Sequence, residues 1–459
     1  MPAPLPTQKP FEFTPAQVLV LGFAALILIG TGLLMLPMAS ESGESFGFVN
    51  ALFTATSAVC VTGLIVADTA TQFTTFGELV VLGLIQAGGL GIMTLSGLML
   101  MLMGRRITLQ ERLVMQEALG SFSIAGVVRL TKNIILTTLA IEGTGMALLT
   151  AHFLTIEKLP FKTALYWGFF HSVSAFNNAG FDVTTASLKP FAKAPLVLLI
   201  IGSLITLGSI GFPVMQEVWR ERRWERLSLH SRLSIKVTLL LIFGGMALLA
   251  MTEWNNPNTF GALPWYHRLS NAWFASVTPR TAGFESIATG ALWDVSLLIT
   301  ILLMFIGASP GGTGGGIKTT TATMIMLSVR ATAQGKEAVE VMGRRIARDL
   351  MEKAFVIGTI ALLLVVTVTG LLLVTENTAI EDPSSPINFI KLLFEVTSAF
   401  GTVGLTAGVT PLLSVAGKLL ITLTMFVGRV GPLTMAVALA QRKFNRSPIH
   451  YPEDRVMIG

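Results

Sequence analysis

Residues 168–181 read GFFHSVSAFNNAGF, an aromatic start and a run of small residues followed by a polar turn whose glycine precedes Phe. The same arrangement occurs three more times, at residues 51–64 (ALFTATSAVCVTGL), 272–284 (AWFASVTPRTAGF) and 392–405 (LLFEVTSAFGTVGL). The turn glycines are Gly63, Gly180, Gly283 and Gly404, separated by 117, 103 and 121 residues. Each stretch predicts a short helix that ends in a glycine turn, and the four copies predict a fourfold internal repeat.

The chain around these four stretches is strongly apolar. Hydrophobic residues make up 52% of the 459 residues and charged residues 13%, and the mean hydropathy is +0.70. A soluble domain carries roughly 25% charged residues, so lipid has to be the solvent for most of this surface, with no separate soluble domain. Eight apolar runs are mostly long enough to cross a hydrocarbon core of ~30 Å. They cover residues 16–38, 79–103, 133–151, 194–216, 235–251, 292–306, 354–374 and 414–440.

Positive charge is concentrated in alternate connections between these runs. The net charge is +6, and 22 of the 32 Lys and Arg residues lie in both tails and in residues 105–132, 220–236 and 330–353. The positive-inside rule therefore places these segments and both termini in the cytoplasm. Topology accounts for the basic balance, so no nucleic-acid partner is expected. The single cysteine, Cys60, excludes an intramolecular disulfide and a cysteine-based zinc site.

The repeats predict a particular kind of membrane site. Non-helical backbone at membrane depth is tolerated only where protein buries it or where it lines a watery cavity. Four turns around a pseudo-fourfold axis would present rings of carbonyl oxygens that replace the water shell of an ion. Glycine permits the positive φ that such turns need, and the negative C-terminal ends of the short helices favour a cation. The alternative, that these glycines serve only helix packing, fits four copies in register poorly.

A second glycine-rich stretch, GASPGGTGGGIKTTT at residues 307–321, follows the sixth apolar run. A phosphate-binding P-loop places Lys directly after Gly, whereas Ile317 separates Gly316 from Lys318 here. Glycine costs a helix about 1 kcal/mol relative to Ala and proline about 3 kcal/mol, so residues 309–316 cannot remain helical. The sequence IKTTTATMIML that follows can resume a helix. The stretch predicts either a mobile polar loop across a pore or a static kink used for packing.

At these residues the chain resembles the Trk/Ktr/HKT superfamily of potassium transporters, and most of all KtrB-type subunits, over nearly its whole length. The matching motifs are FTPAQVLVLGF, LIQAGGLGIMT, SAFNNAGF, TPRTAGF, SAFGTVGLT and FVGRVGPLT. The resemblance implies an all-α integral membrane fold of four membrane helix–pore helix–filter loop–membrane helix repeats around a pseudo-fourfold pore. The short N-terminal tail favours the KtrB type over Trk-type relatives, which carry an extra helical hairpin. The expected divisions are an N-terminal tail (1–15), repeats at 16–104, 105–219, 220–335 and 336–441, and a C-terminal tail (442–459).

The resemblance also assigns the residues of a potassium selectivity filter and of a gate. The filter segments are Cys60, Val61, Thr62 and Gly63; Asn177, Asn178, Ala179 and Gly180; Arg280, Thr281, Ala282 and Gly283; and Gly401, Thr402, Val403 and Gly404. Glycine at all four last positions goes with selectivity for K⁺ over Na⁺ in this family, with Na⁺ open as a co-ion or activator. The gate is the loop 307–316 beneath the filter, formed by Ser309, Pro310, Gly311, Gly312, Thr313, Gly314, Gly315 and Gly316 with Lys318 and Arg429. No organic cofactor is expected.

Two intramembrane cations need an explanation, because charge at membrane depth is costly and usually functional. Arg429 lies inside the last apolar run, and the resemblance places it beneath the filter near the gate. It either opposes cations and holds carbonyls of the loop, or pairs with a buried carboxylate for structure. Lys318 either does similar work at the end of the loop or caps the resumed helix.

Other polar residues near the turns have weaker assignments. Arg280 would repel K⁺ if it faced the axis, so its side chain is expected to point behind the filter and to bond groups of the pore helix. Glu395 is expected to be a structural partner rather than an ion ligand, and His171 a packing residue of its pore helix. Three acids that follow filter glycines either concentrate cations at the outer mouth or are ordinary solvated charges. They are Asp68, Asp182 and Glu285.

The expected partners follow from the resemblance. KtrB-type subunits form a homodimer beneath which lies a cytoplasmic ring of nucleotide-binding, KtrA-like RCK subunits, and the three basic cytoplasmic segments either dock that ring or serve only topology and contact with anionic lipid. The alternatives are a Trk-type subunit, a broken-helix secondary transporter of another solute, and an integral-membrane enzyme. The secondary transporter predicts two related halves, whereas four similar units occur. An enzyme would need a shared cluster of reactive side chains, which five scattered histidines and one cysteine do not supply.

Overall fold

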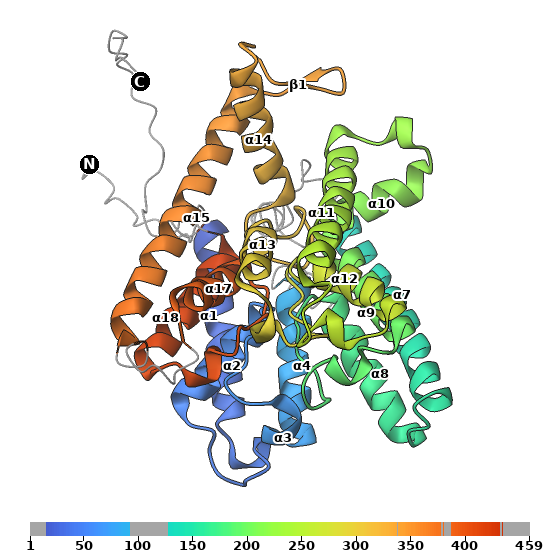
Figure 1. Ribbon diagram of the computed structural model, residues 1–459, viewed down its shortest axis with the longest axis vertical. Helices are drawn as coiled ribbons and strands as arrows, with labels where there is room; N and C mark the ends of the chain where they lie inside the picture. Colours follow the sequence, from blue (N-terminus) through green and yellow to red (C-terminus); the bar gives the residue numbers. More distant parts are fainter. Residues whose placement is uncertain are drawn as a thin grey trace, which may run out of the picture.

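The protein is described here by a computed structural model that covers residues 15–91, 127–336, 338–377, 380, 387–431 and 434. These residues are predominantly helical (Figure 1). In this part of the chain, strand occurs only in a small antiparallel hairpin of β1 (Glu340–Val341) and β2 (Arg344–Arg345). The predicted all-α class is therefore confirmed.

Each predicted repeat begins with a long apolar helix. These helices are α1 (Pro15–Leu34), α7 (Val127–Thr155), α11 (Leu229–Glu253) and α15 (Arg348–Thr375). All four are long and apolar enough to cross a membrane. Their outward faces leave leucines uncovered, with Leu28 61% exposed, Leu240 67% and Leu363 59%. Such faces require lipid contact, so the chain is a multi-pass membrane protein.

A shorter helix follows each long one and ends at a predicted filter segment. These pore helices are α2 (Phe48–Val59), α8 (Phe161–Phe176), α12 (Trp265–Val277) and α17 (Phe389–Gly401). Figure 1 shows α2 and α17 on one side of the molecule and α8 and α12 on the other. Their last turns are buried, as the predicted half-helices require.

A third helix completes each repeat and is shorter than the sequence predicts. These helices are α4 (Thr75–Leu90), α9 (Pro195–Ile210), α13 (Asp294–Phe305) and α18 (Val415–Val430). Three of them end at a glycine with positive φ, namely Gly91 (81°), Gly211 (98°) and Gly431 (92°). The predicted runs 79–103 and 414–440 extend beyond the ends of α4 and α18 into residues that are mostly outside the described ones.

The prediction of one continuous span over residues 194–216 is wrong. The chain bends by 95° between α9 and α10 (Phe212–Glu221). Gly211 takes a conformation that residues with a Cβ rarely adopt, and Pro213 lacks the N–H that a continuing helix would need. Hydropathy alone predicted the span because both segments are apolar at their junction.

The third helices close the four repeats into a ring. Helix α4 packs on the next pore helix α8, α9 packs on α12, α13 packs on α17, and α18 returns to pack on α2. One hydrophobic cluster accordingly joins residues of the first repeat, such as Phe53 and Ile85, to Phe400 and Met425 of the fourth. The four predicted filter segments are therefore neighbours around this ring.

The remaining elements lie at the two ends of this ring. Helix α14 (Thr319–Ala333), the hairpin and α10 lie at one end of the molecule, and α3 (Thr69–Gln72) lies at the other (Figure 1). The basic segments 220–236 and 330–353 thus share one end. Short 3-10 turns occupy several connections: Pro37–Ala39, Lys189–Phe191, Trp224–Arg226, Phe260–Ala262, Thr289–Ala291 and Thr410–Leu412.

Buried carboxylates join the first and third helices in two repeats. Glu253, at the end of α11, accepts a hydrogen bond from the backbone N–H of Trp293 at the start of α13 (3.0 Å). Glu376, just after α15, accepts from the backbone N–H (3.1 Å) and hydroxyl (2.6 Å) of Ser414 at the start of α18. A negative group at a helix N-terminus satisfies free N–H groups and the helix dipole. These contacts fix where the spans of these repeats begin.

Candidate functional site

The four filter glycines form a closed cyclic arrangement. A Cβ built on Gly63 would lie 2.5 Å from the carbonyl oxygen of Ala179. A Cβ on Gly180 would lie 2.6 Å from the carbonyl oxygen of Ala282, and a Cβ on Gly283 would lie 2.5 Å from the carbonyl oxygen of Val403. Gly404 closes the ring against the carbonyl of Thr62. Each glycine therefore leaves room for the carbonyl of the next repeat, and only hydrogen fits at its Cα.

The filter backbone has the same unusual conformation in all four segments. The predicted positive φ of the glycines is confirmed, with values from 69° to 92°. The second residue of each segment also has positive φ: Val61 (56°), Asn178 (61°), Thr281 (70°) and Thr402 (49°). A left-handed residue with a Cβ costs roughly 1–2 kcal/mol, and this strain is typical of functional sites. The sequence held no signal for it, because Val and Thr avoid this region.

Backbone N–H groups of the filter point back toward the ends of the pore helices. In three repeats the third residue donates to a carbonyl six residues before the glycine: Thr62 to Ser57 (2.7 Å), Ala179 to Ser174 (2.8 Å) and Val403 to Ser398 (2.8 Å). The N–H groups of Gly63 and Gly404 donate to the hydroxyls of the same Ser57 and Ser398, at 3.0 and 3.1 Å. In the third repeat Ala282 donates to the carbonyl of Thr278 (3.0 Å). These bonds fix each segment to the end of the helix that precedes it.

A buried polar network that the sequence pattern did not predict lies behind the second predicted filter segment. The side-chain amide of Asn177 donates to the carboxylate of Glu142 in α7 (2.9 Å) and to Gln86 in α4 (2.8 Å). Gln86 also donates to Glu142 (3.3 Å). This network joins the second filter segment to the third helix of the first repeat and the first helix of the second. A Glu inside an apolar run was the available signal, since a charged residue there usually has a specific partner.

The other polar residues predicted near the filter have structural contacts. Arg280 is 1% exposed and donates to the carbonyl of Thr238 (3.2 Å) in α11, so its partner is the first helix rather than the predicted pore helix. Glu395 accepts hydrogen bonds from the hydroxyls of Thr406 (2.6 Å) and Thr410 (2.5 Å), which confirms it as a structural partner. His171 is buried among aromatic rings, as predicted.

The predicted gate segment is non-helical, and its residues are buried or half-buried. No helix is assigned between the end of α13 at Phe305 and the start of α14 at Thr319, as predicted. The loop is anchored to the second repeat by backbone bonds from Ser309 to Ser209 (2.9 Å) and from Thr313 to Gly208 (3.1 Å). A third bond runs from Phe212, at the bend after α9, to the carbonyl of Gly311 (3.0 Å).

The same loop lies against the filter. A Cβ on Gly314 would collide with the hydroxyl of Thr281, and one on Gly315 with the hydroxyl of Thr402. The N–H of Gly315 donates to that Thr402 hydroxyl (3.0 Å). These two glycines are required because the loop passes directly beside the second filter residues of the third and fourth repeats.

Both predicted cations contact this loop. Lys318 Nζ donates to the carbonyl of Gly314 (2.6 Å). The guanidinium of Arg429 donates to the carbonyls of Thr313 in the loop and of Gly88 in α4. Among the described residues the ion pairs do not include Arg429, so its contacts are to the loop rather than to a structural carboxylate. Arg429 thereby links the first, third and fourth repeats.

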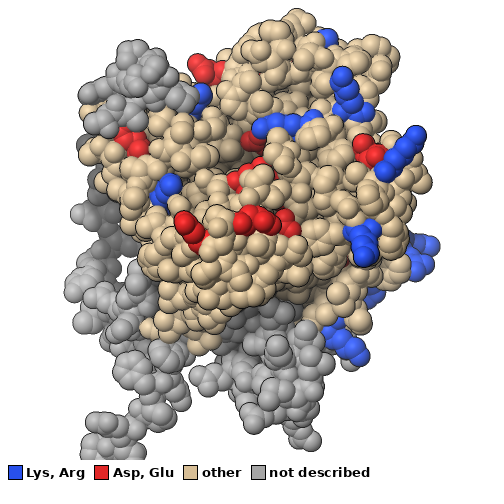
Figure 2. Space-filling view, turned by 90° about the horizontal axis from the view of Figure 1, so that it is seen from below, with Lys and Arg blue, Asp and Glu red and all other residues tan. Residues whose placement is uncertain are grey.

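The three predicted acids gather at the opposite end of the filter from the loop. Figure 2 views this end and shows acidic side chains near the middle of the face. Glu285 forms an ion pair with Lys189 (2.9 Å). Partial burial, together with the negative charge of Asp68 and of Glu285, raises the pKa of Asp182 to about 8. These acids therefore interact across three repeats and are not independent solvated charges.

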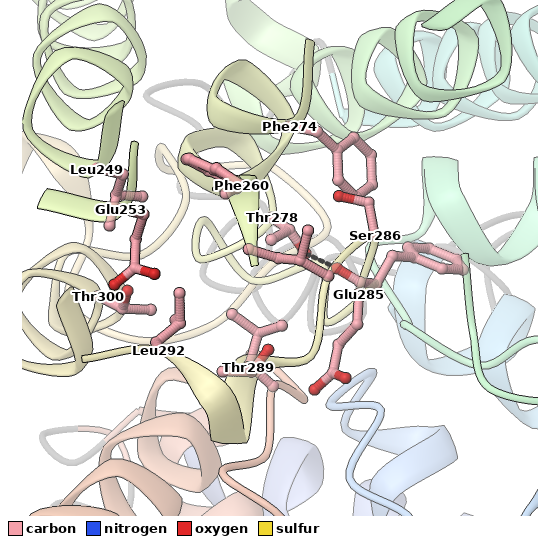
Figure 3. Close-up of a pocket in the computed structure, with 14 residues that line it drawn as sticks. Leu249, Glu253, Phe260, Phe274, Thr278, Glu285, Ser286, Thr289, Leu292 and Thr300 are labelled. Atoms are coloured by element: carbon pink, nitrogen blue, oxygen red, sulfur yellow. Dashed lines mark hydrogen bonds between the residues drawn. The ribbon is translucent and has the colours of Figure 1, made fainter. Parts of the chain in front are cut away.

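A small cavity lies beside the third filter segment (Figure 3). Its volume is about 20 Å³ and it is lined by Phe274, Thr278 and Ser286, among others. The hydroxyl of Thr278 donates to the carbonyl of Phe284 (2.7 Å), and the carboxylate of Glu285 points away from Phe274. The volume is close to that of one water molecule, so this cavity cannot hold an organic substrate.

Comparison with known proteins agrees with this geometry. The sequence profile of the TrkH family, described as cation transport protein, matches residues 8–447. The chain is 42% identical to Ktr system potassium uptake protein B of Bacillus subtilis (98% of this chain, 97% of the relative). It is 38% identical to potassium/sodium uptake protein NtpJ of Enterococcus hirae (98% of each chain).

The fold also matches a solved structure. The crystal structure of the potassium transporter TrkH from Vibrio parahaemolyticus superposes with a TM-score of 0.73 at 16% identity, over 94% of this chain and 86% of that one. The family match covers the four filter segments, the loop and Arg429. The chain therefore belongs to the TrkH family of cation transport proteins.

Proposed function

We propose that this chain is the potassium-translocating pore subunit of a Ktr-type K⁺ uptake system. The closed ring of glycines and carbonyls carries the proposal. Four carbonyls from equivalent positions, each beside the glycine of the preceding repeat, provide the oxygen cage that replaces the hydration shell of K⁺. The names of the relatives support K⁺ as the ion, since the first two are a potassium and a potassium/sodium uptake protein.

The four segments from Cys60 to Gly63, Asn177 to Gly180, Arg280 to Gly283 and Gly401 to Gly404 are the proposed filter. The C-terminal ends of the pore helices lie behind them and stabilise a cation at the centre. A secondary transporter of an organic solute would need a cavity at the membrane midplane of a size to hold that solute. The site beside the ring is instead built from backbone carbonyls, which suits a bare ion.

The loop 307–316 is the proposed gate beneath this filter. Its bonds to Ser209, Gly208 and Thr402 and the contacts of Arg429 and Lys318 hold it across the pathway in the described conformation. A loop of this kind controls flux only if the closed and open states differ in stability. The two cations raise the electrostatic barrier to K⁺ as well as anchoring the loop.

Regulation is proposed to come from outside the chain. A homodimer of these subunits on a cytoplasmic RCK ring, KtrA-like, is supported by the Ktr systems to which the first relative belongs by name. The end of the molecule that carries α10, α14 and the hairpin is then cytoplasmic, and both termini with it. Size-exclusion chromatography with light scattering tests the dimer, and a monomer with full partner binding and flux would contradict it.

A sodium requirement is the second candidate feature. The Enterococcus relative is named as a potassium/sodium uptake protein, and the acids at the outer mouth provide a place where cations concentrate. Uptake of K⁺ in a transport-deficient cell, with and without Na⁺ and with and without the partner, tests both parts. Failure of uptake under all four conditions, with the protein inserted in the membrane, would refute the proposed function.

A further inference from the structure

A basic cavity lies far from the filter, at the end of the molecule that carries the hairpin. Its volume is about 590 Å³, and it opens between α14, the hairpin and α15. Ala331 and Thr332 of α14 form one wall, and Met351 and Phe355 of α15 form another. In Figure 1 these two helices converge toward the hairpin at the top of the molecule. Nothing in the filter or gate uses this cavity.

Three cationic side chains and one carboxylate line it. They are Lys336, Arg345, Arg348 and Glu352. Glu352 accepts from Arg348 (3.1 Å), so the carboxylate is already paired. Among the described residues, neither Lys336 nor Arg345 takes part in an ion pair. The cavity therefore presents two positive charges, from different segments of the chain, that form no ion pair within the described part of the chain.

The hairpin fixes one of these charges at the mouth. Pairing of Glu340 with Arg345 and of Val341 with Arg344 closes the hairpin. A bond from the N–H of Ile346 to the carbonyl of Val339 (2.9 Å) continues the pairing at its base. Arg345 is thereby held on a short ordered element and not on a free loop, which lowers the entropy lost when it binds an anion.

The lower walls of the cavity are apolar and exposed. Phe355, which lines it, is 41% exposed, and Leu350 on the same helix is 52% exposed. On α14, Met326 and Val329 are 68% and 57% exposed. Phe355 lies seven residues, or about two turns, further into the apolar helix α15 than Arg348. The cavity therefore has a charged upper part and an oily lower rim.

From this arrangement we propose that the cavity binds the phosphate headgroup of an anionic phospholipid. Lys336 and Arg345 would bind the phosphate through charge-assisted hydrogen bonds, and Met351 and Phe355 would pack against the first carbons of the acyl chains. Basic pockets between helices at the cytoplasmic surface favour anionic headgroups in this way. A soluble partner protein fits less well, because the lower rim is apolar and belongs to the membrane-length helix α15.

The position of α14 gives this site a consequence for transport. Helix α14 begins at Thr319, directly after Lys318, whose side chain holds the carbonyl of Gly314 in the loop. A lipid that fixes α14 against α15 restricts the movement of the segment that leaves the loop. This consequence rests on the proposed gate, whereas lipid binding itself does not.

The test measures binding first. Purified protein in detergent is titrated with phosphatidylglycerol or phosphatidylcholine and the adducts are counted by native mass spectrometry. The parent should retain phosphatidylglycerol in preference to phosphatidylcholine. The double variant K336Q/R345Q should bind it roughly tenfold or more weakly, and the charge-preserving K336R/R345K should bind it as the parent does.

A matched control removes the same charge elsewhere at this end. Arg223 and Arg226 are exposed and lie outside the cavity, so R223Q/R226Q should keep the preference. An equal loss of phosphatidylglycerol binding in both double variants would contradict the proposed site. Unchanged phosphatidylglycerol binding in K336Q/R345Q would contradict it as well. Displacement of the lipid by millimolar inorganic phosphate would assign the cavity to free phosphate and overturn the lipid. Loss of partner binding with intact lipid binding would assign it to the partner instead.

A flux measurement separates this inference from the proposed function. Parent protein in phosphatidylcholine liposomes with and without phosphatidylglycerol should differ in K⁺ flux, and K336Q/R345Q should not respond to the anionic lipid. If no variant conducts K⁺ in any liposome, the proposed function fails while the binding result stands. If all conduct equally in all liposomes and bind lipid equally, the inference fails while the proposed function stands.

Discussion

The side-chain amide of Asn177 donates to the carboxylate of Glu142, 2.9 Å away, and so ties the second filter segment to the first helix of its own repeat. Gln86 of the preceding repeat completes the contact from the other side. Asn177 is fully buried and Glu142 nearly so. A filter segment with positive φ at a non-glycine residue needs such support, because its backbone is intrinsically unstable.

Replacing Glu142 by Ala should therefore loosen the second filter segment. The buried amide of Asn177 would lose one of its acceptors and keep those of Gln86 (2.8 Å) and Val173 (2.9 Å). A lost hydrogen bond of this kind is worth about 0.5–1.5 kcal/mol, and the discrimination of K⁺ over Na⁺ should fall several-fold. Glu142→Gln keeps an acceptor oxygen and should retain most of the discrimination of K⁺ over Na⁺. Relative K⁺ and Na⁺ flux in liposomes measures both. Thr144→Ala, on the exposed face of the same helix, is the control, and equal selectivity in all variants would leave Glu142 without a positioning role.

Replacing Gly63 by Ser should also weaken selectivity. Its φ is 90°, and an added Cβ would meet the carbonyl of Ala179 at 2.5 Å. Gly43 provides a matched control, since its φ is 70° but no atom lies within 4 Å of its Cβ position. Gly43→Ser carries similar backbone strain without the collision. Gly63→Ser should lower the K⁺ to Na⁺ permeability ratio, and Gly43→Ser should leave it unchanged. An unchanged permeability ratio in Gly63→Ser would refute the filter assignment.

Weakening the anchors of the loop should raise flux. Arg429→Ala removes the contacts to the carbonyls of Thr313 and Gly88, and deletion of residues 311–315 removes the segment that lies beside the filter. Both changes should shift the population toward the open state and speed K⁺ flux into liposomes without the partner. Selectivity should stay nearly constant, because the ring of carbonyls is untouched.

Arg220→Ala serves as the control for lost charge, since this arginine is exposed and lies on α10. It should leave flux at the level of the parent. The loop is only a kink if Arg429→Ala and the deletion both fold, insert and conduct no faster than this control.

Transport should depend on external pH through Asp182. Its pKa is raised to about 8 by burial and by the charges of Asp68 and Glu285, so the carboxyl is mostly neutral at neutral pH and becomes charged as the pH rises through 8. A new negative charge at the mouth concentrates cations, so the KM for K⁺ should fall roughly twofold or more across this range. Lys189 remains paired with Glu285 and reduces the field.

Initial rates of K⁺ uptake at external pH values on both sides of 8 measure this effect. Asp182→Asn should abolish the pH dependence of KM, while Glu44→Gln, at an exposed position in another loop of the chain, should preserve it. A pH dependence of KM that persists in Asp182→Asn would show that a different group titrates.

Much of this protein could be predicted from local properties of its sequence. The apolar runs required a membrane, because hydropathy acts residue by residue. The repeated glycine turns predicted re-entrant segments with positive φ, and the eight residues from Ser309 to Gly316 predicted a break, because glycine and proline disfavour a helix wherever they occur. These expectations needed no knowledge of which segments meet.

Tertiary structure alone decided what depends on contacts between distant segments. Gly63 lies so close to the carbonyl of Ala179 that a Cβ would collide with it, and this close approach exists only because the first repeat packs beside the second. The bend at Gly211 is supported by a bond from Phe212 to Gly311 of the loop, 99 residues further on. The partners of Asn177 lie 35 and 91 residues away in the chain. No local pattern encodes these pairs, because packing and burial fix them only after the four repeats close into a ring.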